Sequence, residues 1–349
     1  MSDALFVGLD IGGTSTRALV AAADGTRLGA GQAGGGNPTS HDPPAAAASL
    51  RAALDAALHG LDPALVRGGV VGLAGVGKLA ASPTAAAAFE SAWRSAGLRC
   101  PYRLVSDALV GYASGAYSPD GTVLVAGTGA IAAAVRGLAL DRVVDGHGWL
   151  LGDLGSGFWL GREAARAALA VFDGAAPDGP LAASVRARLL GAAVLPGQPR
   201  QAASALVQAV NGRPPVLLAD LAPLVFAAHG TDPVAERLVA TAADHLVATL
   251  ALVHGAVGEA TRTDVDVHGR RPVVLAGGLL TSKTPLAGAV RARIAERWPD
   301  AEVHRAGDGA AAAVWLAIRE QPGADPVALH GMLLGSLSDL EDLRLPGQP

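Results

Sequence analysis

The sequence has little cysteine, few aromatic residues and no strong excess of charge of either sign. Cys100 is the single cysteine, which excludes a disulfide within the chain and argues against a thiolate zinc or iron–sulfur site held by one chain. The 9 histidines are scattered without the spacing of zinc ligands, so a zinc enzyme is not expected. Lys and Arg total 27 against 31 Asp and Glu, and the net charge of −4 gives no field that would attract nucleic acid or an acidic membrane.

Long apolar runs are also missing. No charge-free stretch reaches the roughly 18 apolar residues that a membrane span requires. The N-terminus lacks a basic segment followed by an apolar core, which is the pattern of a secretory signal. We therefore expect a cytoplasmic protein that binds small molecules and neither nucleic acid nor membrane.

The chain is rich in glycine and in small apolar residues. Its 349 residues correspond to two domains at roughly 100 to 200 residues per domain. Apolar residues make up 50% and charged residues 17%, which excludes disorder as the general state. Because there are only 5 Phe, 3 Tyr and 5 Trp, the core must be built mainly from Ala, Val and Leu.

Two glycine-tipped hairpins divide the chain. Residues 5–20 read as a strand, a glycine turn and a second strand, and residues 121–137 repeat that design with little sequence identity. We interpret this as a structural duplication. The predicted domains are residues 1–120 and 121–320, followed by a peripheral helix and tail over residues 321–349.

The regions between and after the hairpins alternate helical and strand patterns. Residues 43–59 have a helical apolar spacing, and Ser82 followed by Pro83 marks the start of another helix. YRLVSD reads as a strand that ends on Asp107, and the chain is mostly helical from Gly155 to about Val257. Alternation of strands and helices in this order is typical of an α/β fold.

The first turn, GLDIGGTSTR, has features of a phosphate-binding loop. Gly12 and Gly13 leave backbone N–H groups open to phosphate oxygens, and Thr14 and Thr16 could add hydroxyl donors. Asp10 ends the buried strand where a magnesium ion with its water shell could be held. The alternative is an ordinary hairpin turn with an aspartate at the end of the strand.

The second turn, LVAGTGA, contains Gly127, Thr128 and Gly129. Gly-Thr-Gly alone is a common turn. Two such turns, roughly 115 residues apart, are more informative because the phosphate tail of ATP can be gripped from both sides of a cleft. The pair therefore favours phosphate binding more than either turn does alone.

Asp107 lies between a predicted strand and a predicted helix. One interpretation is a helix cap. The other is a carboxylate at the carboxyl edge of a sheet, where open α/β folds bind ligands and where it could accept the proton of an attacking alcohol.

The segment from Asp145 to Glu163 has the highest density of glycine around large side chains. Its glycines surround His147, Trp149 and Asp153, which suggests a loop shaped around a ligand, with a structural loop as the alternative. By contrast, GLAGVGKL resembles a nucleotide P-loop but has Leu79 where the magnesium-binding hydroxyl is required, so we do not assign one.

Seven motifs occur together in one order: GLDIGGTSTR, GGGNP, GLAG, VSDALVGYASG, AGTG, GWLLGDLGSGFWLGRE and VVLAGGLL. As a set they resemble the N-acetylglucosamine kinase family, which also contains the ATPase activators of acyl-CoA reductases and dehydratases. That family lies within the sugar kinase, actin and chaperone ATPase superfamily. The resemblance covers approximately residues 5–320 and is specific as a set, although each motif is common.

The resemblance implies an α/β fold of two ribonuclease-H-like, actin-like ATPase domains with a nucleotide cleft between them. It implies ATP and Mg²⁺ as cofactors, with Asp10 reaching the metal through water. It also implies the following ATP-binding residues: Gly12, Gly13, Thr14 and Thr16 in the first phosphate loop, Gly127, Thr128 and Gly129 in the second, and Gly277 and Gly278 under the adenosine.

The same resemblance assigns the sugar site. Asn37 would bind sugar hydroxyls, Asp107 would be the catalytic base and Asp153 would also bind sugar. The sequence departs from the family in two places beside this loop. The usual Gly-Trp-Gly becomes a run with His147 before Gly148, and the usual Asp-Glu-Gly becomes Asp-Leu-Gly. These departures bear on the substituent at sugar C2 more than on phosphoryl transfer.

The expected reaction is transfer of the ATP γ-phosphate to the 6-hydroxyl of glucosamine. A pocket with Asp107, Asp153 and Asp145 suits the partly protonated amine of glucosamine. N-Acetylglucosamine is the alternative acceptor, and its methyl group would favour an apolar or aromatic wall. An activator ATPase, a scaffold and a sugar-responsive repressor are the other classes. The activators carry cluster cysteines, whereas this chain has only Cys100, and a repressor needs a basic helix-turn-helix, which does not precede the first strand. A scaffold would not need Asn37, Asp107 and Asp153 together. The Ala- and Leu-rich helices between residues 181 and 257 leave room for a homodimer, although such stripes are more often core.

Overall fold

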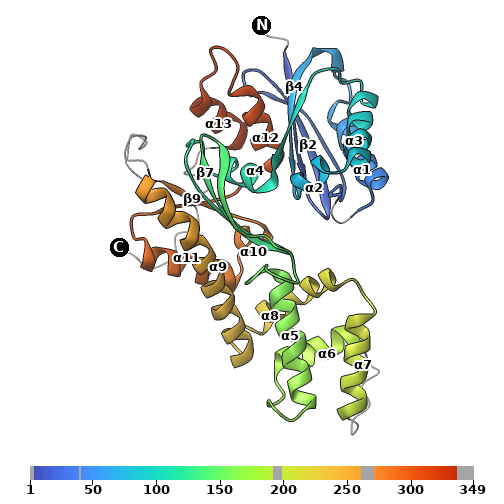
Figure 1. The fold of residues 1–349 in the computed structure, drawn as a ribbon, viewed down its shortest axis with the longest axis vertical. Helices are drawn as coiled ribbons and strands as arrows, with labels where there is room; N and C mark the ends of the chain where they lie inside the picture. The colour runs from blue at the N-terminus through green and yellow to red at the C-terminus, as the bar shows by residue number, and fades with distance from the viewer. Residues whose placement is uncertain (1–3, 39–40, 192–198, 261–270, 336–349) are drawn as a thin grey trace. The chain divides into compact units, whose positions relative to one another are not determined.

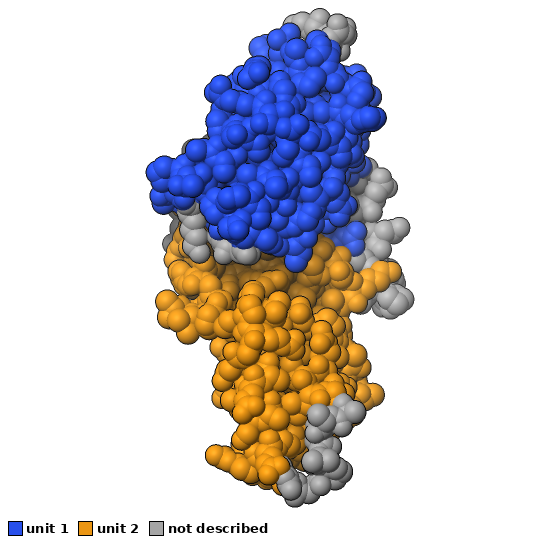
Figure 2. Space-filling view, turned by 90° about the vertical axis from the view of Figure 1, so that its right-hand side faces the viewer, with its two compact units in different colours: residues 1–120, 135–139, 304–349 blue, residues 121–134, 140–303 orange. Residues whose placement is uncertain are grey.

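The computed structural model describes residues 4–38, 41–191, 199–260 and 271–335. The chain divides into two compact units, coloured blue and orange in Figure 2. Unit 1 contains residues 1–120, 135–139 and 304–349, and unit 2 contains residues 121–134 and 140–303.

The sheet of unit 1 has five strands in the order β3-β2-β1-β4-β5 within the described residues. The strands are β1 (Leu5–Ile11), β2 (Ser15–Ala22), β3 (Arg27–Gly34), β4 (Val66–Leu73) and β5 (Tyr102–Ser106). β1 and β2 form the antiparallel hairpin predicted from the sequence, and β3 continues it. β4 pairs parallel to β1 and β5 pairs parallel to β4, so these three strands end at the same edge of the sheet.

Helices cover both faces of this sheet (Figure 1). They are α1 (Pro43–Ala57), η1 (Pro63–Leu65), α2 (Val76–Ala80), α3 (Pro83–Ser95), α4 (Asp107–Ala113), α12 (Gly309–Ile318) and α13 (Pro326–Leu334). Asp42 and Ser82 accept backbone N–H groups at the starts of α1 and α3, each followed by the proline that favours a first helical turn. α1 packs on β3 and α3 on one face, and α12 packs on β1, β4 and α4 on the other.

α12 is apolar on all sides and lies directly against the backbone of β1. A Cβ atom on Gly8 would lie 2.3 Å from the carbonyl oxygen of Ala310 and 2.3 Å from the nitrogen of Val314. No L side chain fits at this distance, because the atoms in contact are main-chain atoms that cannot rotate away. Gly8 is therefore required for the contact that holds α12, and with it the end of β1, in place.

The second sheet, most of which belongs to unit 2, has five strands in the order β8-β7-β6-β9-β10, counted over the described residues. The strands are β6 (Gly121–Ala126), β7 (Ala130–Arg136), β8 (Ala139–Asp145), β9 (Pro272–Ala276) and β10 (Glu302–Arg305). In each unit the first strand is therefore flanked by the second and the fourth, in the same order. This shared topology confirms the predicted duplication and the α/β class.

Unit 2 carries a large helical region after β8. The helices of this region are α5 (Gly157–Phe172), α6 (Pro180–Leu190), α7 (Pro199–Asn211), η3 (Pro215–Leu221), α8 (Ala222–Ala228) and α9 (Pro233–Ala260). Two more helices, α10 (Gly278–Thr281) and α11 (Pro285–Arg297), follow β9. Leu181, Val185 and Leu250 are fully buried in the core of this unit. Much of the apolar surface between residues 181 and 257 is thus used inside the unit, and a homodimer stays a prediction.

The units differ from the predicted domain boundaries at the C-terminal end. We expected residues 121–320 to form one domain, but residues 304–320 group with unit 1 because α12 packs on the first sheet. The expected peripheral helix is α13, which also packs on α12. The tail from residue 336 onward lies outside the described residues.

We expect Gly8→Ala to lower the free energy of unfolding of unit 1 by about 3 kcal/mol, the upper end of the range for overpacking a core. Gly331→Ala is the matched control, because a Cβ there meets nothing within 4 Å and the position lies inside a helix. The control should be neutral or stabilising by up to about 1 kcal/mol. Urea unfolding followed by tryptophan fluorescence measures both, and equal stability of Gly8→Ala and wild type would contradict the packing argument.

Candidate functional site

The first glycine turn and the loop after β3 form one structure. The N–H of Gly12 donates to the carbonyl of Ser15 at 2.9 Å and closes the turn between β1 and β2. The N–H of Gly36 donates to the carbonyl of Gly12 at 3.2 Å. Asn37, the residue after Gly36, is buried at 6% exposure. The predicted sugar-binding asparagine thus lies on the loop that packs against the predicted phosphate turn.

The two threonines of the first turn differ in access. Thr14 is exposed at the tip of the turn. Thr16 lies in β2 opposite Ile11 and is fully buried, and its hydroxyl has no hydrogen-bond partner among the described residues. Thr14 is therefore the threonine whose hydroxyl is open to a phosphate, whereas direct phosphate contact by Thr16 would require the turn to move.

Asp10 and Asp107 lie at the same edge of the first sheet. Asp10 is the penultimate residue of β1, and Asp107 is the first residue of α4, directly after β5. Only β4 separates the two strands, with Gly72 in register opposite Asp10. Neighbouring strands are about 4.8 Å apart, so the two backbones are separated by roughly 10 Å and their carboxylates repel each other.

Burial is the largest cause of the raised pKa of both carboxyl groups. It raises the pKa of Asp10 to about 6. The positive charge of Arg17 lowers this pKa, and the negative charges of Asp107 and Asp308 raise it further. Burial also raises the pKa of Asp107, while hydrogen bonds from the Ser106 hydroxyl and the Ala108 N–H lower it in part. A buried carboxylate beside others is electrostatically suited to a cation or to accepting a proton.

The start of α12 packs against Asp10. A Cβ atom on Gly309 would lie 2.5 Å from Oδ2 of Asp10. Asp308 caps this helix by accepting the N–H of Ala310 and pairs with Arg27 at 3.1 Å. This contact was not predicted, because Asp-Gly before an alanine run indicates the start of a helix but does not reveal which strand end the helix meets.

The second glycine turn is held by the first turn of α5. Gly127 N–H donates to the Gly129 carbonyl at 2.9 Å inside the turn. The N–H groups of Gly157 and Phe158 donate to the carbonyls of Gly127 and Thr128 at 2.8 and 3.1 Å. These bonds use amides at the start of α5 that no intrahelical carbonyl can reach, and they fix the turn in place.

Asp153 adjoins this second turn. Its Oδ1 accepts the N–H of Ala130, the residue after Gly129, at 3.0 Å. The residue is buried at 8% exposure, and burial raises its pKa, although the Ala130 hydrogen bond and nearby His147 lower it. The predicted sugar-binding aspartate and the predicted phosphate loop are thus in direct contact within unit 2.

The predicted adenosine residues lie beside the same turn. Gly277 has a φ of +82°, and a Cβ there would lie 2.3 Å from the carbonyl oxygen of Ala126, directly before Gly127. A Cβ on Gly278 would meet nothing within 4 Å. Gly277 is therefore a packing position next to the second turn, and Gly278 presents open space.

The predicted site residues fall into two groups, one in each unit. Unit 1 holds Asp10, Gly12, Gly13, Thr14, Thr16, Asn37 and Asp107, and unit 2 holds Gly127, Thr128, Gly129, His147, Gly148, Asp153, Gly277 and Gly278. Within each unit the structure places a phosphate turn next to a polar side chain assigned to the sugar. That the two groups face one ligand stays a prediction.

A family comparison agrees with these motifs. The sequence profile of the BadF/BadG/BcrA/BcrD ATPase family matches residues 7–315. The chain belongs to this family. No curated protein sequence matches the chain significantly.

Solved structures of similar fold include a proposed N-acetylglucosamine kinase from Chromobacterium violaceum. It is 27% identical with a TM-score of 0.68, and the alignment covers 90% of this chain and 98% of that chain. A second proposed N-acetylglucosamine kinase, from Porphyromonas gingivalis, is 20% identical with a TM-score of 0.64, covering 94% and 98%. A ROK family glucokinase from Streptomyces griseus, in complex with glucose and AMPPNP, is 19% identical with a TM-score of 0.51, covering 89% and 96%. The last two show the fold alone.

Membership of the BadF/BadG/BcrA/BcrD ATPase family implies an ATP site, and the turns fit one. Thr14 is exposed in the first turn, and a Cβ on Gly127 in the second would meet nothing within 4 Å. The described residues contain no cluster of three or more metal-ligating side chains. Mg²⁺ in nucleotide sites is commonly held by one or two carboxylates, waters and the phosphates themselves, so a single carboxylate such as that of Asp10 is compatible with a magnesium site, and its role as ligand stays a prediction.

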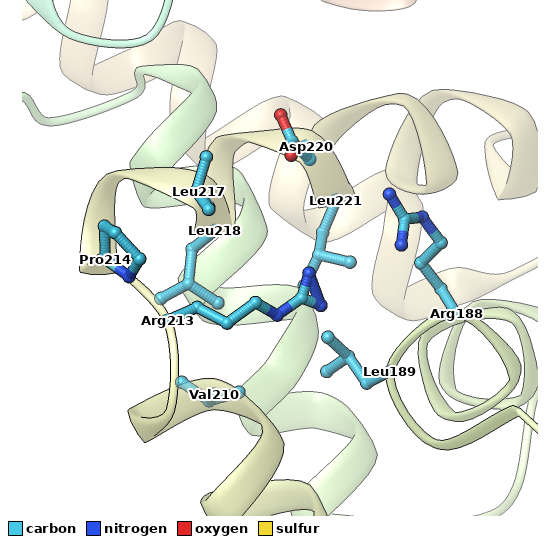
Figure 3. Close-up of a pocket in the computed structure, with 9 residues that line it drawn as sticks. All are labelled: Arg188, Leu189, Val210, Arg213, Pro214, Leu217, Leu218, Asp220 and Leu221. Atoms are coloured by element: carbon cyan, nitrogen blue, oxygen red, sulfur yellow. The ribbon is translucent and has the colours of Figure 1, made fainter.

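A cavity in the helical region of unit 2 does not compete with this site. Figure 3 shows its lining residues Leu189, Val210 and Leu221, with the side chain of Arg213 extending between them. Its volume is about 10 Å³, which is room for about one water molecule. Among the described residues, every helix is also too short or too polar to cross a lipid bilayer.

We expect Asp10→Asn to stabilise the protein at neutral pH while it impairs function. A pKa of about 6, against the ordinary 3.8, means that keeping this carboxylate ionised costs about 3 kcal/mol at pH 7.5. At pH 4 the carboxyl is protonated in the folded chain and still about half ionised in the unfolded chain, so most of the gain should disappear there.

Urea unfolding at pH 7.5 and pH 4, in EDTA, measures this difference. Asp325→Asn is the control, because Asp325 is an exposed helix cap in the same unit. A gain of similar size at both pH values would show that relief of the buried charge is not its cause.

Proposed function

We propose that the protein is an ATP-dependent hexosamine kinase that transfers the γ-phosphate of ATP to the 6-hydroxyl of glucosamine. The observation that carries the proposal is the partly buried carboxylate of Asp107 at the same sheet edge as Asp10, whose strand leads into the Gly12 turn. The Chromobacterium violaceum structure, itself a proposed sugar kinase, supports the same class of reaction.

Asp107 is the proposed general base. The sugar 6-oxygen attacks the γ-phosphorus, its proton passes to the Asp107 carboxylate, and the bond to the bridging oxygen breaks to release ADP. Because burial raises the pKa of Asp107, its carboxylate is a stronger base than an exposed aspartate. The Ser106 and Ala108 hydrogen bonds fix one oxygen and leave the other for the substrate.

The remaining groups align the reactants and neutralise charge. The Gly12 and Gly127 turns would hold phosphates, and Mg²⁺, when bound near Asp10, would supply positive charge to them. Asn37 and Asp153 would hold the sugar hydroxyls. Little covalent help is needed for this reaction, since alignment and charge neutralisation provide most of the rate.

Glucosamine is the favoured acceptor because its ammonium group suits a pocket rich in carboxylates. N-Acetylglucosamine is the alternative, favoured by the Chromobacterium violaceum structure and by the exposed apolar side chains near Asp153. These are Trp149, Leu150, Leu151 and Leu154, which are 40%, 73%, 81% and 41% exposed.

An activator ATPase of the same family is the second class. Such an activator needs cysteines for an iron–sulfur cluster, and Cys100 is the only cysteine. It is half-buried in unit 1, its pKa is raised by burial, and it precedes Pro101 instead of following the second turn. ATP consumption that depends on added hexosamine separates the kinase from this class and from a scaffold or sensor.

Asp107→Asn should lower kcat by about 10² to 10⁴ with little change in the KM for ATP, because the amide keeps the size of the side chain and cannot take the proton. In wild type, kcat should fall as the pH falls through the raised pKa of Asp107, since the base must be ionised. Asp325→Asn is the control, as an exposed cap in the same unit. Near-normal turnover of Asp107→Asn would remove Asp107 as the base.

A coupled ADP assay with glucosamine, N-acetylglucosamine and no sugar tests the substrate. We expect glucosamine to have the higher kcat/KM and the reaction without sugar to be slower than with it, because water should be a poor acceptor. A higher kcat/KM for N-acetylglucosamine would reassign the acceptor. ATP hydrolysis that neither sugar accelerates would overturn the kinase proposal.

A further inference from the structure

The loop that joins β8 to α5 has an unusual backbone. Asp145 and Asp153 adopt positive φ values of +64° and +58°, a region that is costly for residues other than glycine. Gly146, Gly148 and Gly155 in the same loop are also at positive φ. Aspartate tolerates this region better than most residues, but specific interactions must hold two of them there within nine residues.

The carboxylate of Asp145 provides such interactions. Its Oδ1 accepts the N–H of Asp153 at 2.8 Å, and its Oδ2 accepts the N–H of Leu154 at 3.1 Å. A Cβ atom on Gly152 would lie 2.1 Å from Oδ1, so the loop can close over this carboxylate only with glycine there. Both oxygens of Asp145 are therefore engaged with the backbone at the far end of the loop.

These contacts belong to a closed ring of hydrogen bonds. Asp145 holds the N–H of Asp153, and Oδ1 of Asp153 holds the N–H of Ala130. The carbonyl of Ala130 accepts the N–H of Gly146, the residue after Asp145, at 3.0 Å. The ring ties the end of β8, the start of β7 and Asp153 together, and Ala130 directly follows the second glycine turn.

The ring indicates a role for Asp145 that differs from the one expected from the sequence. From the sequence, we expected Asp145 to be a further carboxylate that binds the amine of the sugar. A carboxylate whose two oxygens each accept a backbone N–H is instead positioned to orient its partners. Asp153, by contrast, uses Oδ1 for Ala130, and no hydrogen bond to its Oδ2 is found within the described part of the chain.

We infer that Asp145 is a positioning residue that fixes Asp153 to receive the acceptor sugar and keeps Asp153 in register with the second phosphate turn. This inference rests on the proposed function for its kinetic consequence. The ring itself is a property of unit 2 and can be tested without any substrate.

Two variants of Asp145 distinguish the effect of losing the carboxylate from the effect of disturbing the backbone at positive φ. Asp145→Asn tolerates positive φ about as well as aspartate, and it keeps one oxygen but places an amide N–H₂ against one of the two N–H donors. Asp145→Ala removes both acceptors. We expect the KM for the sugar to rise about tenfold in Asp145→Ala, with a smaller rise in Asp145→Asn, because a misplacement of about 1 Å is costly in an aligned site.

A double-mutant cycle with Asp153→Ala tests whether Asp145 acts through Asp153. When Asp153 has lost its carboxylate, Asp145→Ala should raise the KM for the sugar by less than about twofold further. Multiplication of the two single effects would overturn the inference, because Asp145 would then act independently. Asp141→Asn, an exposed aspartate on the same strand, is the control and should leave KM unchanged.

Amide hydrogen exchange provides the readout without substrate. The N–H groups of Asp153 and Leu154 should exchange at least tenfold faster in Asp145→Ala than in wild type, and at the wild-type rate in Asp141→Asn. If wild type phosphorylates no hexosamine, the proposed function fails and the exchange result alone decides the inference. Unchanged protection of both amides in Asp145→Ala would overturn it, and Asp145→Asn serves if the alanine variant does not fold.

Discussion

The carboxylate of Asp10 at the end of β1 is the constraint on which the site in unit 1 depends. Asp10 is partly buried, and its loss of solvent together with the charges of Asp107 and Asp308 raises its pKa to about 6. Such a group destabilises the fold unless a cation or a proton neutralises it. The backbone contact between α12 and β1 nevertheless keeps it in place, since Gly8 and Gly309 let the helix approach without a side chain between them. A carboxylate that carries this electrostatic cost is suited to the metal ion that the proposed function places beside the nucleotide.

Both units hold a glycine turn in place by main-chain hydrogen bonds. Each begins with a strand, a glycine turn and a second strand, and each turn is bonded by main-chain groups from a neighbouring segment of its own unit. In unit 1 the neighbour is the loop of Asn37, and in unit 2 it is the first turn of α5. A turn that is already bonded loses little conformational freedom when a phosphate binds, which is the physical value of such preorganisation.

Much of the fold could be predicted from residue patterns. Three predicted elements have strong local signals and are present in the structure. The hairpin over residues 5–20 is formed by β1 and β2, the helix over residues 43–59 is α1, and the strand before Asp107 is β5. The grouping of α12 with unit 1 could not be predicted, because the sequence of an apolar, alanine-rich helix does not indicate which sheet it packs on; the close approach of its backbone to Gly8 of β1 is a tertiary contact. The burial of Thr16 was also missed, since the alternation of a strand shows which residues share a face but not which face is covered.

The sequence by itself determined the local elements and the chemistry available in them: two glycine turns, strand-end aspartates and a glycine-rich loop. Local steric preference and hydrophobic period are encoded within a few residues, so they can be read directly from the chain. Only the tertiary structure decided which of these groups meet. The repulsion between Asp10 and Asp107 arises from strands about a hundred residues apart, and the task of Asp145 arises from hydrogen bonds across the loop to Asp153 and on to Ala130. Hydrogen bonds and charge interactions act over a few ångströms, so they exist only after the chain has folded.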